Sequence, residues 1–133
     1  MKTIKNIKTA ILSIAIGVLS STAVYAQDHE HNSAPHGGII EEAGGFHIES
    51  AIKSNKVYFY LLDGNAKAIS NKGVTGSVLL QYADGTTKTV QLTASGKDGF
   101  SVEDTKAVNY INAVVTFKTN GKTASTKFKN KAK

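Results

Sequence analysis

The histidines of this chain lie close together in the sequence. All four, at positions 29, 31, 36 and 47, fall within residues 27–50, a segment that also holds half of the ten carboxylates and no lysine. Imidazole nitrogen and carboxylate oxygen are ligands for zinc, copper and similar divalent metals. The chain beyond residue 50 contains no histidine and is rich in lysine. We therefore expect residues 27–50 to carry the chemistry of the protein, and we expect that chemistry to be metal binding.

Two of the histidines stand beside glycines in what we predict to be a hairpin. The first lies in Pro35-His36-Gly37-Gly38 and the second in Gly45-Phe46-His47-Ile48-Glu49. Residues two apart on a strand share a face and lie about 6.6 Å apart, so the side chains of His47 and Glu49 leave the core side together.

A two-residue turn at Ala43-Gly44 would bring Gly38 opposite Glu49 and His36 onto the same face. We therefore predict one ion held by His36, His47 and Glu49. The alternative is that His36 caps a turn and His47 is an exposed residue of an edge strand.

A second candidate site depends on where the chain is processed. Cleavage after Ala26 would leave the terminus Gln27-Asp28-His29, in which an amine, two amides and an imidazole can form a square plane suited to copper(II) or nickel(II). His31 is then an additional ligand. Cyclisation of Gln27, or cleavage one residue away, would remove this site.

The first 26 residues have the features of a secretory signal peptide. Three lysines precede the apolar run of residues 11–19, and Val24-Tyr25-Ala26 suits a cleavage site. We expect an exported, periplasmic or secreted protein without stable membrane insertion, because no segment approaches about 20 apolar residues. The chain has no cysteine, so any metal is held by nitrogen and oxygen ligands.

The rest of the chain is long enough for one domain. Residues 27–34 are polar and unpatterned and predict a disordered leash, residues 35–129 a single domain, and residues 130–133 a basic tail. Alternating polar and apolar residues predict strands joined by glycine-bearing turns. We expect about eight antiparallel strands in an all-β sandwich or small barrel. The predicted strands are 38–41, 46–53, 56–62, 74–82, 87–94, 101–103 and a hairpin that turns at Asn120-Gly121.

Other functions find little support in the sequence. The G-x-S-x-G, P-loop and H-E-x-x-H motifs are all absent, so we do not expect an enzyme. We do not expect nucleic acid as a partner despite the formal charge of +6, because the chain contains no arginine.

Residues 35–67 resemble a known family. P-H-G-G, then glycine, an aromatic residue and His-x-Glu, followed by Val57-Tyr58-Phe59-Tyr60-Leu61-Leu62-Asp63 and Lys67, are similar to the small β domain of periplasmic adaptor subunits of heavy-metal efflux pumps. The resemblance implies an immunoglobulin-like fold and metal binding at His36 and His47. The chain departs from the pattern at Asn65-Ala66-Lys67, where glycine before the lysine is expected. It also lacks the coiled-coil hairpin of the adaptors.

These observations lead to one expectation and one alternative. We expect an exported protein that binds zinc, copper or a similar ion through His36, His47 and Glu49, assisted by His29 and His31, and that acts beside a heavy-metal efflux pump. The alternative is a β-sandwich with a structural or interaction role and no metal.

Overall fold

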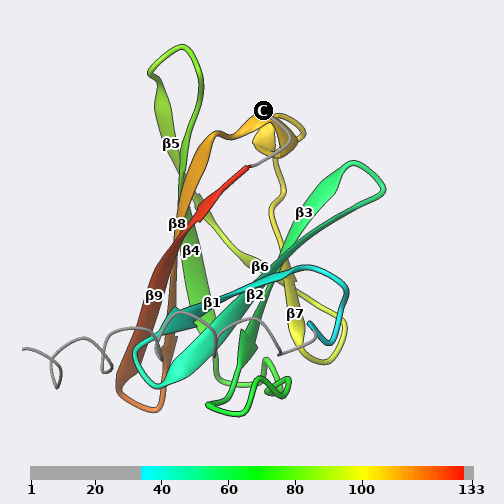
Figure 1. The fold of residues 1–133 in the computed structure, drawn as a ribbon, viewed down its shortest axis with the longest axis vertical. Coiled ribbons are helices and arrows are strands. Elements are labelled where there is room, and N and C mark those ends of the chain that lie inside the picture. Colours follow the sequence, from blue (N-terminus) through cyan, green and yellow to red (C-terminus); the bar gives the residue numbers. More distant parts are fainter. Residues whose placement is uncertain (1–33, 131–133) are drawn as a thin grey trace, which may run out of the picture. The chain divides into compact units, whose positions relative to one another are not determined.

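The protein is an all-β sandwich of two antiparallel sheets (Figure 1), as the sequence predicted. The computed structural model describes residues 34–130. The predicted leader, the leash up to residue 33 and the last three residues lie outside this range. The first sheet has the strand order β1 (Ile39–Ala43), β2 (Phe46–Lys53), β3 (Lys56–Leu62), β7 (Gly99–Ser101) and β6 (Thr93–Ser95).

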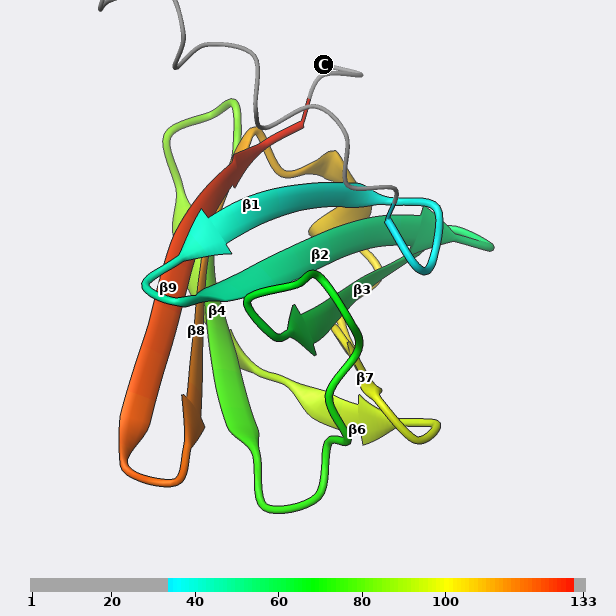
Figure 2. The ribbon, with the colours of Figure 1, turned by 60° about the horizontal axis from the view of Figure 1, so that its bottom comes forward.

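The second sheet faces the first across the core. Its strand order is β5 (Thr87–Gln91), β4 (Thr75–Gln81), β8 (Asn112–Thr119) and β9 (Lys122–Lys129), and a 3-10 turn, η3 (Ala107–Asn109), precedes β8. Figure 2 shows the strands of the first sheet crossing those of the second. The two sheets do not close, so the sandwich is present and the small barrel is not.

The core forms because alternate residues of each strand point inward. The inward positions on β4 are Gly76, Val78 and Leu80, and those on β8 are Ala113, Val115 and Phe117. All six are buried. They meet the inward residues of the first sheet, among them Ile48, Val57, Phe59, Leu61 and Phe100. Each large apolar side chain buried here contributes roughly 1.5–3 kcal/mol of transfer free energy.

Two predicted turns are confirmed. Asn120 and Gly121 both have positive φ and join β8 to β9 in the predicted register, with Phe117 opposite Ala124. The predicted three-residue loop joins β4 to β5, because Tyr82 N–H donates to the Thr86 carbonyl at 2.9 Å. Paired strands follow from local turn chemistry in both places.

The first hairpin turns one residue later than predicted. Gly44 and Gly45 form the turn with φ of 56° and 88°, so Glu49 lies opposite Ile40 instead of Gly38. A two-residue turn of type I′ needs positive φ at both positions. Two glycines meet that need, whereas Ala43 in the first position would be strained.

Strand limits differ from the prediction at three places. The predicted strand 87–94 divides at Leu92 into β5 and β6, which belong to different sheets. Leu92 packs against the core, and its N–H donates to the Gly76 carbonyl at 2.9 Å. The predicted short strands 38–41 and 101–103 run instead over Ile39–Ala43 and Gly99–Ser101. With the division at Leu92, the described residues form nine strands.

A second, smaller apolar cluster covers the outer face of the first sheet. Its buried members are Ala51, Tyr60, Leu62 and Ala66. The segment after β3 folds back over this face (Figure 2), and Ile69 N–H donates to the Leu61 carbonyl at 3.0 Å. This outer face therefore has its own buried apolar cluster, and the candidate site is built beside it. Among residues 34–130 there is no helix with the length and apolar character needed to cross a membrane.

Candidate metal centre

A fully buried carboxylate, Glu49, organises the site. It lies on β2 between Ile40 and Tyr60, on the outer face of the first sheet, and is 0% exposed. Removing a carboxylate from water is costly unless hydrogen bonds replace the lost solvation. Backbone N–H groups of His36 and Gly38 supply two of them, at 2.9 and 2.8 Å from Oε2. The Nδ1 atom of His36 lies 2.7 Å from Oε1.

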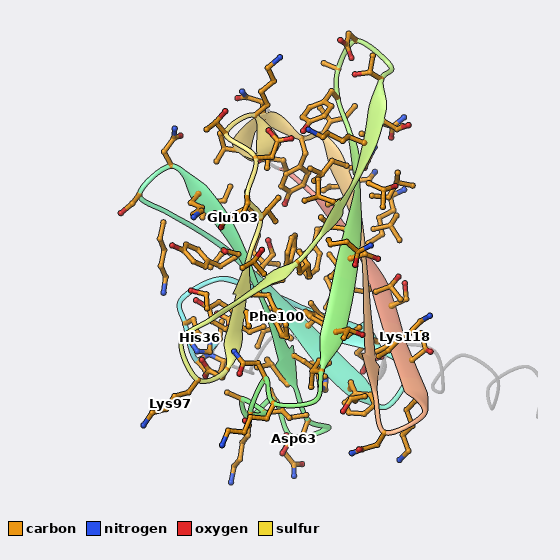
Figure 3. All side chains as sticks on the ribbon, turned by 180° about the vertical axis from the view of Figure 1, so that it is seen from behind. His36, Asp63, Lys97, Phe100, Glu103 and Lys118 are labelled. Carbon is orange, nitrogen blue, oxygen red and sulfur yellow. The ribbon has the colours of Figure 1, made fainter. Side chains whose placement is uncertain are left out.

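The ring of His36 is held on three sides. It stacks on Tyr60 with centroids 3.6 Å apart and planes inclined by 6°. Nδ1 faces Glu49, and Nε2 lies 3.0 Å from Oδ2 of Asp98. The side chain of His36 is 19% exposed, so the ring is fixed yet reachable from solvent. Figure 3 shows His36 beside the turn that carries Lys97.

Asp98 is the site residue that the sequence analysis missed. It lies in the turn between β6 and β7, 62 residues after His36, and its side chain is 33% exposed. Turn aspartates commonly bond their own backbone, so nothing in the local sequence set Asp98 apart. Only the pairing of β7 with β3, which brings Gly99 opposite Tyr60, places this turn beside the histidine.

Asn71 fixes the turn that carries Asp98. Its side-chain amide donates to the carbonyls of Gly96 and Gly99 at 3.1 and 2.9 Å, and its backbone N–H donates to the Lys97 carbonyl at 2.9 Å. Three hydrogen bonds from one residue hold the turn against the sandwich. The Asp98 carboxylate is therefore presented from a defined backbone.

Two glycines allow the close approaches that build the site. A Cβ at Gly38 would lie 2.1 Å from the Ser50 carbonyl oxygen, and a Cβ at Gly99 would lie 2.8 Å from Cε2 of Tyr60. Neither position can carry a side chain without displacing its neighbours. Gly38 thus lets the His36 loop lie against β2, and Gly99 lets β7 lie beside the tyrosine on which His36 stacks.

His47 has different partners from His36. It shares a face of β2 with Glu49, as predicted, but its Nδ1 lies 3.0 Å from the backbone carbonyl oxygen of Asp63. The Asp63 carboxylate accepts backbone N–H groups of Lys67 and Asn65, which hold the pKa of Asp63 below its usual range. The structure thus joins His36 to Glu49 and places His47 against the segment that follows β3.

The expected three-ligand set does not form a closed cage. Within residues 34–130 no three or more histidine, aspartate or glutamate side chains are grouped closely enough to hold a metal ion by themselves. The other two predicted ligands, His29 and His31, lie outside the described residues. A complete coordination sphere would need ligands from that part of the chain, from water or from another molecule.

The two described histidines nevertheless share one property. Nδ1 of each faces an oxygen, the Glu49 carboxylate for His36 and the Asp63 carbonyl for His47. A carbonyl oxygen only accepts hydrogen bonds, so Nδ1 of His47 carries the proton and the neutral ring has its lone pair on Nε2. Metal-ligating histidines are commonly oriented by such a bond from the second nitrogen to a carboxylate or carbonyl.

The segment at Asn65-Ala66-Lys67 shows how the chain accommodates its departure from the efflux-adaptor pattern. Ala66 has φ of 62°, in the left-handed region that favours glycine, and it is buried in the small outer cluster. A methyl group thus occupies the position next to the lysine where the resemblance leads us to expect glycine.

Comparison of the chain with known protein families, with curated protein sequences and with solved structures found no match. The site's geometry and the motifs of residues 35–67 are therefore the basis for assigning a function.

Proposed function

We propose that this is an exported protein that binds zinc, copper or a similar divalent ion and serves heavy-metal homeostasis or efflux as an accessory component. The observation that carries the proposal is the fixed orientation of His36. Its Nδ1 is tied to a buried carboxylate and its ring is stacked on Tyr60, so Nε2 is held ready as a ligand atom. A ligand that is already oriented loses little conformational freedom when it binds.

Glu49 acts in this proposal as a positioning residue for His36. Both of its oxygens are engaged by N–H groups, at distances between 2.7 and 3.2 Å, and it is fully buried. Its contribution is to fix the ring plane and to make the imidazole a stronger donor. His47, also oriented through Nδ1, offers a second nitrogen on the same strand.

The remaining ligands come from the histidine-rich residues before the fold. His31 precedes His36 by five residues, and an extended chain spans at most about 3.3–3.6 Å per residue. His31 is therefore within roughly 17 Å of His36 along the chain, close enough to complete its coordination. If the leader is cleaved after Ala26, Gln27-Asp28-His29 adds a separate square-planar copper site.

The accessory role rests on the resemblance of residues 35–67 to the small domain of efflux adaptors. In this role the sandwich buffers, delivers or senses the metal. An enzymatic role has no support in the motifs of the chain. The shallow, partly exposed position of His36 suits rapid exchange of an ion with a partner.

Titration of the exported, processed protein with zinc(II) and copper(II) tests the proposal. Nitrogen-15 NMR of the histidine rings should show Nε2 of His36 shifting to a metal-bound value at micromolar zinc. His36→Phe keeps an aromatic ring on Tyr60 and removes both nitrogens, so it should abolish that uptake while retaining the fold. If the rings of His36 and His47 do not respond to either metal, the proposal fails and a structural or interaction role is favoured.

A further inference from the structure

We infer that Asp98 is the second ligand of the metal, facing His36 across a shared ion of the zinc class. This inference deepens the proposed function and rests on it. The pair comes from two separate parts of the fold, the loop before β1 and the turn between β6 and β7. The donor atoms, His36 Nε2 and Asp98 Oδ2, lie 3.0 Å apart.

The hydrogen-bonding requirements of the His36 ring point to a cation between these atoms. Glu49 already accepts two backbone N–H groups, and as an ionised carboxylate it can only accept, so Nδ1 of His36 is the donor in their contact. In the neutral ring the lone pair then lies on Nε2 and is directed at a second carboxylate, Asp98. Two acceptors facing each other need a positive charge between them, either a proton or a metal ion.

The separation of the two donors fits one coordination sphere. Zinc lies about 2.0–2.2 Å from nitrogen and oxygen ligands. Two such ligands at tetrahedral or octahedral angles are therefore about 3.0–3.5 Å apart, and the observed 3.0 Å is at the near end of that range. Because the ring of His36 is fixed, the 33% exposed side chain of Asp98 is the one that moves to admit the ion.

The supports of both donors make the site stiff. Glu49 and Tyr60 fix the ring of His36, and Asn71 fixes the backbone of the turn that carries Asp98. Hydrogen bonds that orient the ligand side chains in this way are typical of metal sites, and their loss commonly costs 10–100-fold in metal affinity. With Asp98 33% exposed, the remaining coordination positions are open to water.

The composition of the pair indicates the class of ion. One imidazole and one carboxylate, with no thiolate or thioether, suit zinc(II) or copper(II) and disfavour copper(I). A carboxylate also sets the pair apart from the terminal tripeptide Gln27-Asp28-His29, where every donor of the square plane is nitrogen. Zinc is therefore the probe that reports on His36 and Asp98, whereas copper also reports on the terminus.

The test is a zinc titration of the exported, processed protein as wild type, Asp98→Asn and Asp84→Asn. Asp84 is the matched control, because it also lies in a hairpin turn and its carboxylate accepts from the backbone N–H and hydroxyl of Thr86. We expect Asp98→Asn to weaken zinc binding at least about tenfold and Asp84→Asn to leave it unchanged within twofold. The circular dichroism spectrum should be the same for all three proteins.

The outcomes separate this inference from the proposed function. Zinc that shifts Nε2 of His36 with equal affinity in wild type and Asp98→Asn removes Asp98 from the site and leaves metal binding in place. If zinc shifts His47 but not His36 in the wild type, this inference fails and the bridging charge is a proton. If neither ring responds to zinc or copper, the proposed function fails with it. Asn71→Ala adds a second measurement: it loosens the turn without removing a ligand and should weaken zinc binding less than Asp98→Asn does.

Discussion

At the scale of single residues, the site depends on a glutamate with no exposed surface. Glu49 stands between Ile48 and Ser50 in a strand whose pattern predicts an outward polar residue, and its side chain does leave the main core. It is buried nonetheless, because the His36 loop covers the outer face of the sheet and supplies its hydrogen bonds. Alternation along a strand fixes the face of a side chain but not what lies over that face.

Replacing Glu49 by glutamine should destabilise the protein and weaken its metal binding. The amide presents two donors and only one acceptor oxygen to three N–H groups. We expect the free energy of unfolding to fall by about 2–4 kcal/mol, measured by urea denaturation. Zinc affinity, measured on the folded protein without denaturant, should fall about 10–100-fold.

The control for this variant is Glu103→Gln. Glu103 is half exposed and pairs with Lys56 at 2.7 Å, and exposed ion pairs contribute little to stability. Its replacement should change stability much less than Glu49→Gln does and should leave zinc binding unaltered. Equal effects of the two variants on stability and zinc affinity would show that the buried contacts of Glu49 contribute no more than an exposed ion pair does.

At the scale of elements, the loop before β1 is the part that links the sequence motif to the site. Gly37 has φ of 77°, and Gly38 lies so close to β2 that a Cβ would overlap the carbonyl of Ser50. The P-H-G-G motif therefore has a structural reason as well as a chemical one. Its glycines let the chain turn and lie flat, so that the backbone N–H groups of residues 36 and 38 reach Glu49.

Gly38→Ala should move this loop away from β2. The added methyl would lie 2.1 Å from a backbone oxygen, and backbone atoms of a paired strand cannot yield cheaply. We expect a loss of more than about 1 kcal/mol in the free energy of unfolding and a loss of zinc binding at His36. The stacking of His36 on Tyr60, seen as ring-current shifts in the NMR spectrum, should disappear as well.

Gly64→Ala is the matched control for the loop variant. Gly64 also lies in a turn beside the first sheet, but a Cβ there would meet only the Gly45 carbonyl oxygen, at 3.3 Å, and its φ is not positive. A small shift accommodates that contact. Zinc affinity should therefore be retained, and an equal loss in both variants would show that the motif glycine has no specific role.

At the scale of the whole molecule, the proposed metal site would join segments that are far apart in the chain. An ion shared by His36 and Asp98 would tie the loop before β1 to the turn between β6 and β7. Because this geometry exists only in the folded protein, zinc should stabilise the fold. At a free zinc concentration one hundred times Kd, the free energy of unfolding should rise by about 2.7 kcal/mol, measured as an increase in Tm.

Copper bound to the N-terminal tripeptide should behave differently. That site needs only adjacent residues of the chain, so it forms equally in the folded and unfolded protein and leaves Tm unchanged. Deletion of residues 27–31 should remove this copper component and retain zinc stabilisation in reduced form. A rise in Tm with one equivalent of copper that vanishes on this deletion would contradict the assignment of two separate sites.

Acid should also destabilise the whole molecule. The pKa of Asp104 is lowered chiefly by its hydrogen bond to Lys88, and that of Asp84 by its bonds to Thr86. A carboxyl whose pKa is lower in the folded than in the unfolded state adds stability above its unfolded pKa. That stability is lost as pH falls through the folded pKa.

The urea midpoint, measured without metal, should therefore decrease as the pH falls through the ordinary carboxyl range and on through the lowered pKa of these two groups. The double variant Asp84→Asn, Asp104→Asn should show a flatter dependence on pH. If its profile matches that of the wild type, these two carboxylates do not contribute to the acid sensitivity.

The sequence by itself determined the elements whose signals are local. Asn120-Gly121 specified its hairpin because both positions need positive φ. Alternating residues specified β2 and the inward face of β8, and a run of β-branched and aromatic residues specified β3. The placement of His36 and Glu49 on the same face was also predicted, but the turn lies at Gly44-Gly45, and the contact between the two residues is made by the loop of residues 36–38. In each case the residues that decide the outcome are neighbours in the chain, and backbone sterics and side-chain period are sufficient.

Only the tertiary structure decided which distant groups meet. The division of residues 87–95 between two sheets, the contact of His47 with the Asp63 carbonyl and the approach of Asp98 to His36 all depend on how the sheets pack and which strands pair. Strand order is set by the burial of apolar surface summed over the whole domain, which no local pattern records. For that reason the sequence identified the imidazole at the centre of the site, and the fold supplied the carboxylate that faces it.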